Sequence, residues 1–135
     1  MDGMQAVVSS KDLESAAELA KSEKLQAKLQ RLLREAAEVE VELSRAEGAI
    51  QGVPHYSVIE SRAHELGQQL SRQVQRRQMN ELAASHPPTA KCPGCGTRCE
   101  LETRQREVNS VDGSIPLQEL VGQCPCCRRS FFPAA

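Results

Sequence analysis

Aromatic residues are nearly absent from the sequence. Tryptophan does not occur, and one tyrosine and two phenylalanines are the only aromatic side chains among 135 residues. Because aromatic side chains supply much of the buried area of a large core, their scarcity argues against one. The composition therefore indicates an elongated or modular molecule.

Long apolar runs are also lacking. A membrane-spanning helix needs roughly 20 consecutive apolar residues, and no segment approaches that length. The N-terminal sequence MDGMQAVVSS has an acidic second residue and no apolar segment of signal-peptide length. We therefore expect a cytoplasmic protein without a membrane partner. In that reducing compartment, six cysteines indicate metal binding rather than disulfides.

A strong charge of either sign and a catalytic pattern are missing too. The net charge of −1 excludes a protein that binds nucleic acid through bulk electrostatics. The three histidines are scattered, and neither a nucleotide-binding loop nor a catalytic triad pattern occurs. His64 beside Glu65 is typical of a solvated pair. We therefore expect no enzymatic activity.

A long helix is predicted in the first third of the chain. Ser10 is the expected N-cap, and neither glycine nor proline occurs between Ser10 and Ala46, so the helix should run to about Ile50. Within it, apolar residues alternate at spacings of four and three, which is a heptad seam. The seam consists of Leu25, Leu29, Leu32, Ala36, Val39, Leu43, Ala46 and Ile50.

A second helix is predicted to follow Gly52 and Pro54. Ser57 with Glu60 three residues later forms a capping-box pattern. The sequence SHPP at residues 85–88 ends the helix and reads as a linker. Its apolar stripe consists of Ile59, Ala63, Leu66, Leu70, Val74 and Leu82.

The distribution of charge distinguishes two possible pairings of these helices. In a parallel homodimeric coiled coil, Glu35 would oppose Glu40, and Glu42 would oppose Glu47, which is like against like. An antiparallel hairpin within one chain instead brings the acidic half of the first helix near arginines of the second. We therefore favour the intramolecular hairpin, with self-association through the helices left open.

All six cysteines lie in the C-terminal third, and four of them form two C-x-x-C motifs. Cys92 and Cys95 form the first pair, and Cys124 and Cys127 form the second. This spacing lets one tight turn direct two sulfurs at one ion, and two such turns complete a tetrahedral zinc site. The sequence therefore predicts four ligands for a single zinc ion.

The 28 residues between the pairs are predicted to form a β-hairpin that turns at Asp112 and Gly113. Its alternation is polar, so we expect exposed strands. Two turns, one hairpin and one metal make a zinc ribbon, with Phe131 and Phe132 packed beneath the metal as a small core.

Cys99 and Cys126 are left over and are interpreted as spare thiols. Cys126 lies inside its own turn, where its sulfur should point away from the ion. A redox role for CPGC would need the motif at a helix N-terminus in a βαβ setting, which the chain lacks. We therefore favour metal binding over redox chemistry.

The predicted fold class is α+β, with a long antiparallel helical hairpin, or a coiled coil, followed by a small zinc ribbon with a β-hairpin. The expected organisation is an N-terminal tail (1–9), the helical hairpin (10–84), a proline-containing linker (85–90) and the four-cysteine ribbon (91–135).

Residues 53–133 resemble a known family. CPGCGTRC, a hairpin and then CPCCRRSFFP are similar to the N-terminal zinc ribbon of bacterial insertion-sequence transposases of the Kra type. The stretch VPHYSVIESRAHELGQQLSRQVQRRQMNEL is similar to the helical region ahead of that ribbon. The resemblance implies that Cys92, Cys95, Cys124 and Cys127 bind zinc and that the ribbon helps to engage DNA.

Such transposases continue into a catalytic domain, whereas this chain ends two residues after FFP. We therefore expect a non-enzymatic module that assists DNA binding or joins a separate transposase catalytic chain. The alternative is a protein-interaction adaptor in which the ribbon is purely structural. The expected phosphate contacts are Lys91, Arg98, Arg104, Arg106, Arg128 and Arg129, with weak DNA binding of limited sequence specificity.

Overall fold

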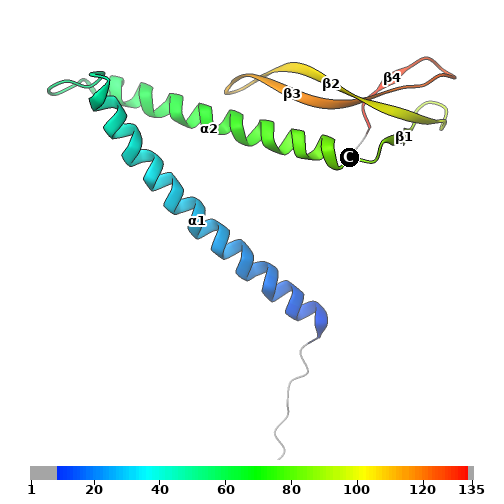
Figure 1. The fold of residues 1–135 in the computed structure, drawn as a ribbon, viewed down its shortest axis with the longest axis horizontal. Helices are drawn as coiled ribbons and strands as arrows, with labels where there is room; N and C mark the ends of the chain where they lie inside the picture. Colours follow the sequence, from blue (N-terminus) through cyan, green and yellow to red (C-terminus); the bar gives the residue numbers. More distant parts are fainter. Residues whose placement is uncertain (1–8, 134–135) are drawn as a thin grey trace, which may run out of the picture. The chain divides into compact units, whose positions relative to one another are not determined.

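The computed structural model describes residues 9–133, and the chain divides into two compact units between His55 and Tyr56 (Figure 1). The first contains helix α1 (Ser10–Ala46). The second contains helix α2 (Tyr56–Ser85) and four strands, β1 (Thr89–Lys91), β2 (Arg98–Ser110), β3 (Gly113–Gln123) and β4 (Ser130–Phe131). The α+β class predicted from the sequence is confirmed. Neither helix is long and apolar enough to cross a membrane.

Helix α1 begins one residue earlier than predicted. Ser9, and not Ser10, is the N-cap: its hydroxyl oxygen accepts a hydrogen bond from the backbone N–H of Asp12 at 3.2 Å. The same hydroxyl donates to the Asp12 carboxylate at 2.7 Å. Two adjacent serines made the choice ambiguous in the sequence. Ser9 is the N-cap because its side chain reaches the backbone N–H three residues later, which would otherwise lack a hydrogen-bond acceptor at the start of the helix.

The helix also ends four residues before the predicted Ile50. The chain turns at Gly48, whose φ of +71° is a left-handed conformation that glycine adopts without strain. The backbone N–H of Glu47 donates to the carbonyl of Leu43 at 2.9 Å and closes the last turn. The heptad seam therefore runs from Leu25 to Ala46 within α1, and Ile50 lies outside the helix.

The seam of α1 is exposed. Leu25 is 56% exposed, Leu29 52% and Val39 60%, and the first unit contains no second helix or strand in its described residues. Ser44 is the only residue of α1 that is buried. An apolar stripe of this length is unusual on a lone helix, since helices normally bury such a face. The antiparallel hairpin and the coiled coil both stay predictions for what covers it.

Helix α2 begins at Tyr56, so Ser57 lies inside the first turn and not at the N-cap position predicted from the capping box. Its end at Ser85, with only His86 between it and the two prolines, agrees with the prediction to within one residue. Proline cannot donate a backbone hydrogen bond, so the helix cannot continue through Pro87 and Pro88.

The strands form one antiparallel sheet in the order β1-β2-β3-β4. The long pair β2–β3 is the predicted hairpin, but its turn lies one residue earlier. Ser110 pairs with Gly113, so Val111 and Asp112 form the two-residue loop. Gly113 has a φ of +114°, which only glycine adopts readily, and it starts β3.

Helix α2 packs against β3, so it belongs to the same unit as the ribbon (Figure 1). Ser71 donates a hydrogen bond to the Asp112 carboxylate at 2.5 Å, and Arg72 donates to the Asp112 carbonyl at 2.8 Å. Asn80 accepts a hydrogen bond from the backbone N–H of Gln118 at 3.3 Å. The sequence predicts a boundary at residues 85–90, whereas the structure places it at the 55–56 junction. A sheet of this size needs a helix to cover its apolar face.

The burial of one face of β3 contradicts a second prediction, which concerns the exposure of the strands. The strands were predicted to be exposed, and β2 largely is, but Ile115, Leu117 and Val121 of β3 are buried. These residues alternate along β3 and so point to one face. Glu119 shares this face and forms an ion pair with Arg106 at 2.5 Å, with its own side chain only 11% exposed.

Close packing at Gly122 generates a prediction. A Cβ added there would lie 2.5 Å from the ring of Phe131, so the Gly122→Ala variant must displace that ring. We expect a loss of about 1–3 kcal/mol in the free energy of unfolding, measured by denaturant titration.

Gly67 provides the matched control. It lies in α2 with nothing near an added Cβ, so Gly67→Ala should stabilise the protein by about 1 kcal/mol. Equal effects of the two substitutions would contradict the packing of Phe131 against Gly122.

Candidate metal centre

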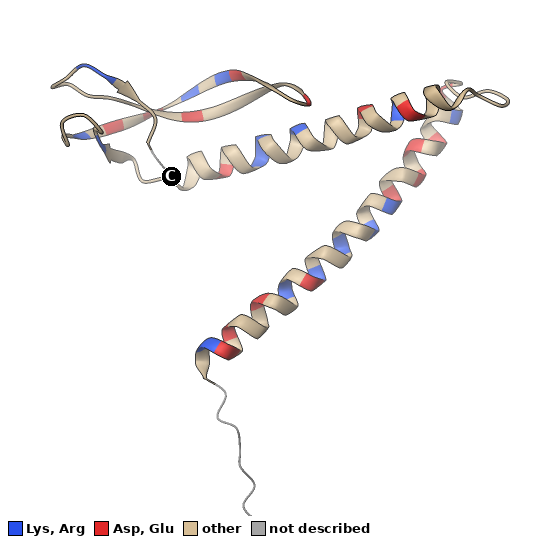
Figure 2. Cartoon of the chain, turned by 180° about the vertical axis from the view of Figure 1, so that it is seen from behind, with Lys and Arg blue, Asp and Glu red and all other residues tan. Residues whose placement is uncertain are grey.

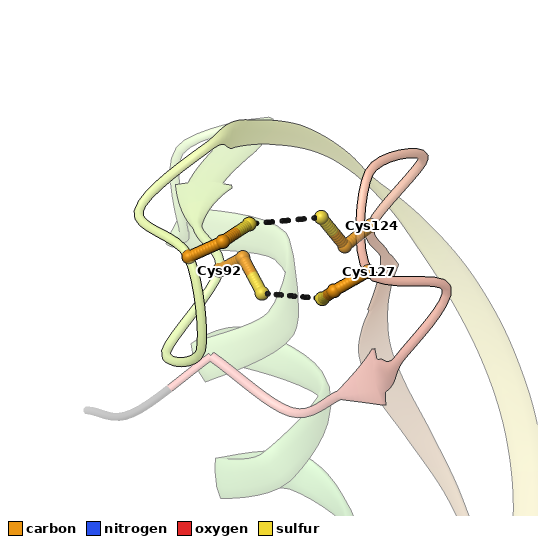
Figure 3. Close-up of side chains that lie close together, drawn as sticks. Cys92, Cys124 and Cys127 are labelled. Carbon is orange, nitrogen blue, oxygen red and sulfur yellow. Dashed lines mark hydrogen bonds between the residues drawn. The ribbon is translucent and has the colours of Figure 1, made fainter.

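The four cysteines predicted as ligands lie together at one end of the sheet. The Sγ atoms of Cys92, Cys95, Cys124 and Cys127 are all within 4.8 Å of one another. Cys92 contacts Cys127 and Cys95 contacts Cys124, each pair at 3.4 Å between sulfurs (Figure 3). Cys92 and Cys124 are buried, whereas Cys95 and Cys127 are exposed. The site therefore has a closed inner side and an open outer side.

Each C-x-x-C motif forms the same tight turn. The carbonyl of Cys92 accepts a hydrogen bond from the backbone N–H of Gly96 at 2.9 Å, and the carbonyl of Cys124 accepts one from Arg128 at 2.9 Å. The backbone N–H groups of the two cysteines donate to Thr97 and Arg129, at 2.8 and 2.9 Å. The two segments are thus equivalent, and we call them the first and second knuckle.

The two knuckles also share a left-handed backbone conformation at the same position. Gly96 has a φ of +75° in the first knuckle, and Arg128 has a φ of +60° at the same place in the second. Glycine adopts this left-handed conformation freely, but a residue with a Cβ is strained there by about 1–2 kcal/mol. The second knuckle therefore holds Arg128 in an unfavourable conformation.

The knuckle backbones favour thiolates. The N–H groups of Cys95 and Gly94 lower the pKa of Cys92, and those of Cys127 and Cys126 lower the pKa of Cys124. The pKa of Cys95 is lowered by Thr97, whose side chain lies 3.2 Å from the sulfur and whose backbone N–H adds to the effect. Three of the four sulfurs are therefore prepared to carry negative charge.

The fourth sulfur, that of Cys127, is less stable as a thiolate because the other sulfurs lie close to it. The backbone N–H of Arg129 lowers the pKa of Cys127, but hydrogen bonds with the sulfurs of Cys92, Cys124 and Cys95, together with desolvation, outweigh that effect and raise the pKa to about 12. Without a cation, the protonated form of the Cys127 thiol is therefore favoured. A bound metal ion would favour the thiolate form of all four cysteines, because metal ligation requires deprotonated thiols.

The donor set fits a metal ion. A tetrahedral ion with bonds of ~2.3 Å to sulfur needs sulfurs roughly 3.8 Å apart. The observed spacing, from 3.4 Å to within 4.8 Å, brackets that value. Four sulfurs in this arrangement suit Zn²⁺ or an iron–sulfur centre.

The leftover cysteines have different environments. Cys99 is 3% exposed and packs with Cys92, Cys124 and Phe131 in the core beneath the knuckles, so it is a core residue rather than a spare thiol. Burial raises its pKa to about 11. Cys126 is exposed and outside the four-sulfur group, as predicted.

The predicted core is only half right. Phe131 is buried beneath the site, but Phe132 is 61% exposed and lies under the Arg106 guanidinium, 5.8 Å from the ring centre. Phe132 directly follows the end of β4 at Phe131, and successive side chains of an extended segment point to opposite faces. Cys99 next to Arg98 on β2 follows the same alternation, and this signal could have identified Cys99 as a core residue.

The six basic residues fall into two groups (Figure 2). Lys91 pairs directly with Arg98 across β1 and β2, near the knuckles. Arg128 and Arg129 belong to the second knuckle, and the Arg129 side chain reaches over Gly94 of the first. These four form the knuckle-end group, which consists of Lys91, Arg98, Arg128 and Arg129.

Arg104 and Arg106 lie apart from that group. They follow Arg98 by six and eight positions on β2, which places them roughly 20–26 Å farther along the strand. Arg106 is already engaged by Glu119 and Phe132. The structure therefore does not gather all six predicted cations into one patch.

Comparisons with protein-family models, with curated proteins and with solved structures found no match to this chain. The transposase resemblance therefore stays an expectation from the motifs.

Metal content provides a direct prediction. Protein purified under reducing conditions should carry one metal ion per chain, measured by elemental analysis, and the Cys124→Ser variant should carry much less. Cys126→Ser is the matched control, because it removes a neighbouring sulfur outside the group and should keep full metal content. No metal in well-folded parent protein would contradict the site.

The strain at Arg128 provides a second prediction. Arg128→Gly should stabilise the metal-loaded protein by about 1 kcal/mol in denaturant titrations, because glycine tolerates the left-handed conformation. Arg129→Gly, one position on and without a positive φ, should destabilise it. The opposite order would show that Arg128 is not strained.

Proposed function

We propose that this protein is a non-enzymatic, cytoplasmic zinc-ribbon module that acts by binding another macromolecule. The observation that carries the proposal is the convergence of four cysteine sulfurs from two equivalent knuckles within 4.8 Å. Four protein sulfurs would fill a tetrahedral coordination sphere, which leaves no open position for a substrate or an activated water. The metal would therefore be structural.

Zinc is the metal that best fits a reducing compartment and a four-thiolate set. The core beneath the knuckles is small, and within the described residues it consists of Cys92, Cys99, Cys124 and Phe131, with Ala90 and Leu101 packed against it. Zinc binding contributes roughly 10–16 kcal/mol in small finger peptides, so it would supply stability that this core cannot.

The first candidate ligand is DNA, bound weakly by the knuckle-end group. Four cations surround a centre whose zinc and four thiolates together carry a net charge of −2, so the local balance is positive. Phosphate contacts require such side chains and no aromatic surface. The resemblance to transposase ribbons points the same way, either for the module alone or beside a separate catalytic chain.

The second candidate is a protein-interaction adaptor in which the ribbon is purely structural. The exposed seam of α1 favours it, since Leu25, Leu29 and Val39 are each more than half exposed. Large exposed apolar patches mark interaction sites in soluble proteins.

Salt dependence of DNA binding tests the first candidate. The double variant Lys91→Gln/Arg98→Gln should weaken binding of a DNA duplex and reduce the slope of log K against log salt by about 1.8, because two phosphate contacts are lost. Fluorescence anisotropy at several salt concentrations measures both quantities.

Arg104→Gln is the matched control, since it removes one cation from the same strand outside the knuckle-end group. An equal effect of Arg104→Gln would show that contact is not confined to the knuckle end. No binding at low salt by the metal-loaded parent would eliminate DNA as the ligand and leave the adaptor function.

A further inference from the structure

We propose that α1 forms an antiparallel homodimer with α1 of a second copy, about a two-fold axis at Arg34. The proposal concerns α1 alone and depends on neither the metal nor DNA. It begins from the exposed seam, whose large side chains Leu25, Leu29, Leu32, Val39 and Leu43 are between 44% and 60% exposed.

The seam is symmetric about Arg34. Leu25 and Leu43 lie nine positions on either side of it, Leu29 and Val39 lie five, and Leu32 and Ala36 lie two. Reversing the helix about that point therefore places each of these seam residues opposite another. Each layer pairs an a position with a d position, which is how antiparallel coiled coils are layered.

Charge is divided at the same point. Residues 21–34 contain five basic side chains and one acidic one, whereas residues 35–47 contain five acidic side chains and one basic one (Figure 2). An antiparallel copy centred on Arg34 sets residues 21–34 of each helix against residues 35–47 of the other, which is basic against acidic. A parallel copy sets like against like over residues 21–47.

Individual flanking positions agree with this pairing. In the antiparallel dimer, Lys28 at g faces Glu42 at g of the second copy, and symmetry makes this favourable pair twice. Leu33, an apolar residue at e and 40% exposed, faces its own copy beside the axis and extends the core. Glu35 facing its copy is the one unfavourable flanking pair.

The seam is also longer than the uninterrupted part of the apolar stripe of α2. That stripe is continuous from Ile59 to Val74, and charged Arg76 and Arg77 follow it. A second copy of α1 matches the seam from Leu25 to Leu43. We therefore infer a second copy, and an intramolecular hairpin is the outcome that would overturn this inference.

Sedimentation equilibrium of the full-length, metal-loaded chain over a range of concentrations tests the proposal. The parent should be a dimer. Leu32→Asp should give a monomer, because it places charge in two core layers beside the axis. Leu13→Asp is the matched control on the same helix, since Leu13 is exposed but outside the symmetric seam, and it should leave the dimer intact.

Orientation is tested by charge reversal. Glu42→Lys should weaken an antiparallel dimer roughly tenfold, because the introduced lysine then faces Lys28 of the second copy, and symmetry repeats this repulsion. The double variant Lys28→Glu/Glu42→Lys should restore the parent affinity. In a parallel dimer Glu42 faces Glu47, so Glu42→Lys would tighten association instead.

Each result has a definite meaning. A monomeric parent overturns the proposal, and a dimer tightened by Glu42→Lys overturns the antiparallel orientation. Helical content by circular dichroism and metal content should match the parent in every variant, so that a loss of mass reports association rather than unfolding. Because these two readouts are independent of the dimer, failure here leaves the metal centre untouched.

Discussion

Four thiol sulfurs within 4.8 Å cannot all carry charge unless a cation lies between them, and the second unit is organised around that constraint. The knuckle backbones lower the pKa of Cys92, Cys95 and Cys124, while the crowding of the sulfurs helps to raise that of Cys127. A metal ion would resolve the conflict and would link two segments separated by the whole β2–β3 hairpin. Because the four cysteines come together only in the folded chain, the free energy of metal binding would become free energy of folding.

A metal ion that joins the two knuckles would explain how a sheet so poor in aromatic residues can form. Phe131 is the one buried aromatic residue in the described chain, and it packs on Gly122, where no side chain could fit without moving the ring. At the far end of the hairpin, the sheet is held differently. Ser71 and Arg72 of α2 bind Asp112 in the turn, and Asn80 satisfies a backbone donor of β3. A metal ion at the knuckles and helix α2 at the turn would thus stabilise opposite ends of the same two strands.

Local patterns were predictable from the sequence, and long-range packing was not. The C-x-x-C spacing located all four sulfurs, because a tight turn is specified by a few adjacent residues. The β-hairpin and both helices were predictable for the same reason. The docking of α2 on the β-hairpin was not, because the hydrogen bonds that fix it to the turn and to β3 come from Ser71, Arg72 and Asn80, which are polar and carry no periodic signal. The alternation of Ile115, Leu117 and Val121 was a readable sign of a covered face on β3, whereas the prediction of exposed strands was drawn from the polar alternation of β2.

The two units use apolar side chains in different ways. In the second unit, metal ligation would substitute for part of a hydrophobic core, so a few buried side chains would suffice to fix the sheet. In the first, leucine and valine are concentrated in one stripe of α1 that its own unit leaves exposed. Exposing such a stripe in water is unfavourable, by about 25 cal/mol for each Å² of apolar surface that a partner would cover. Because the stripe is symmetric about Arg34 and the charge changes sign directly after it, an antiparallel second copy of the same helix satisfies both at once.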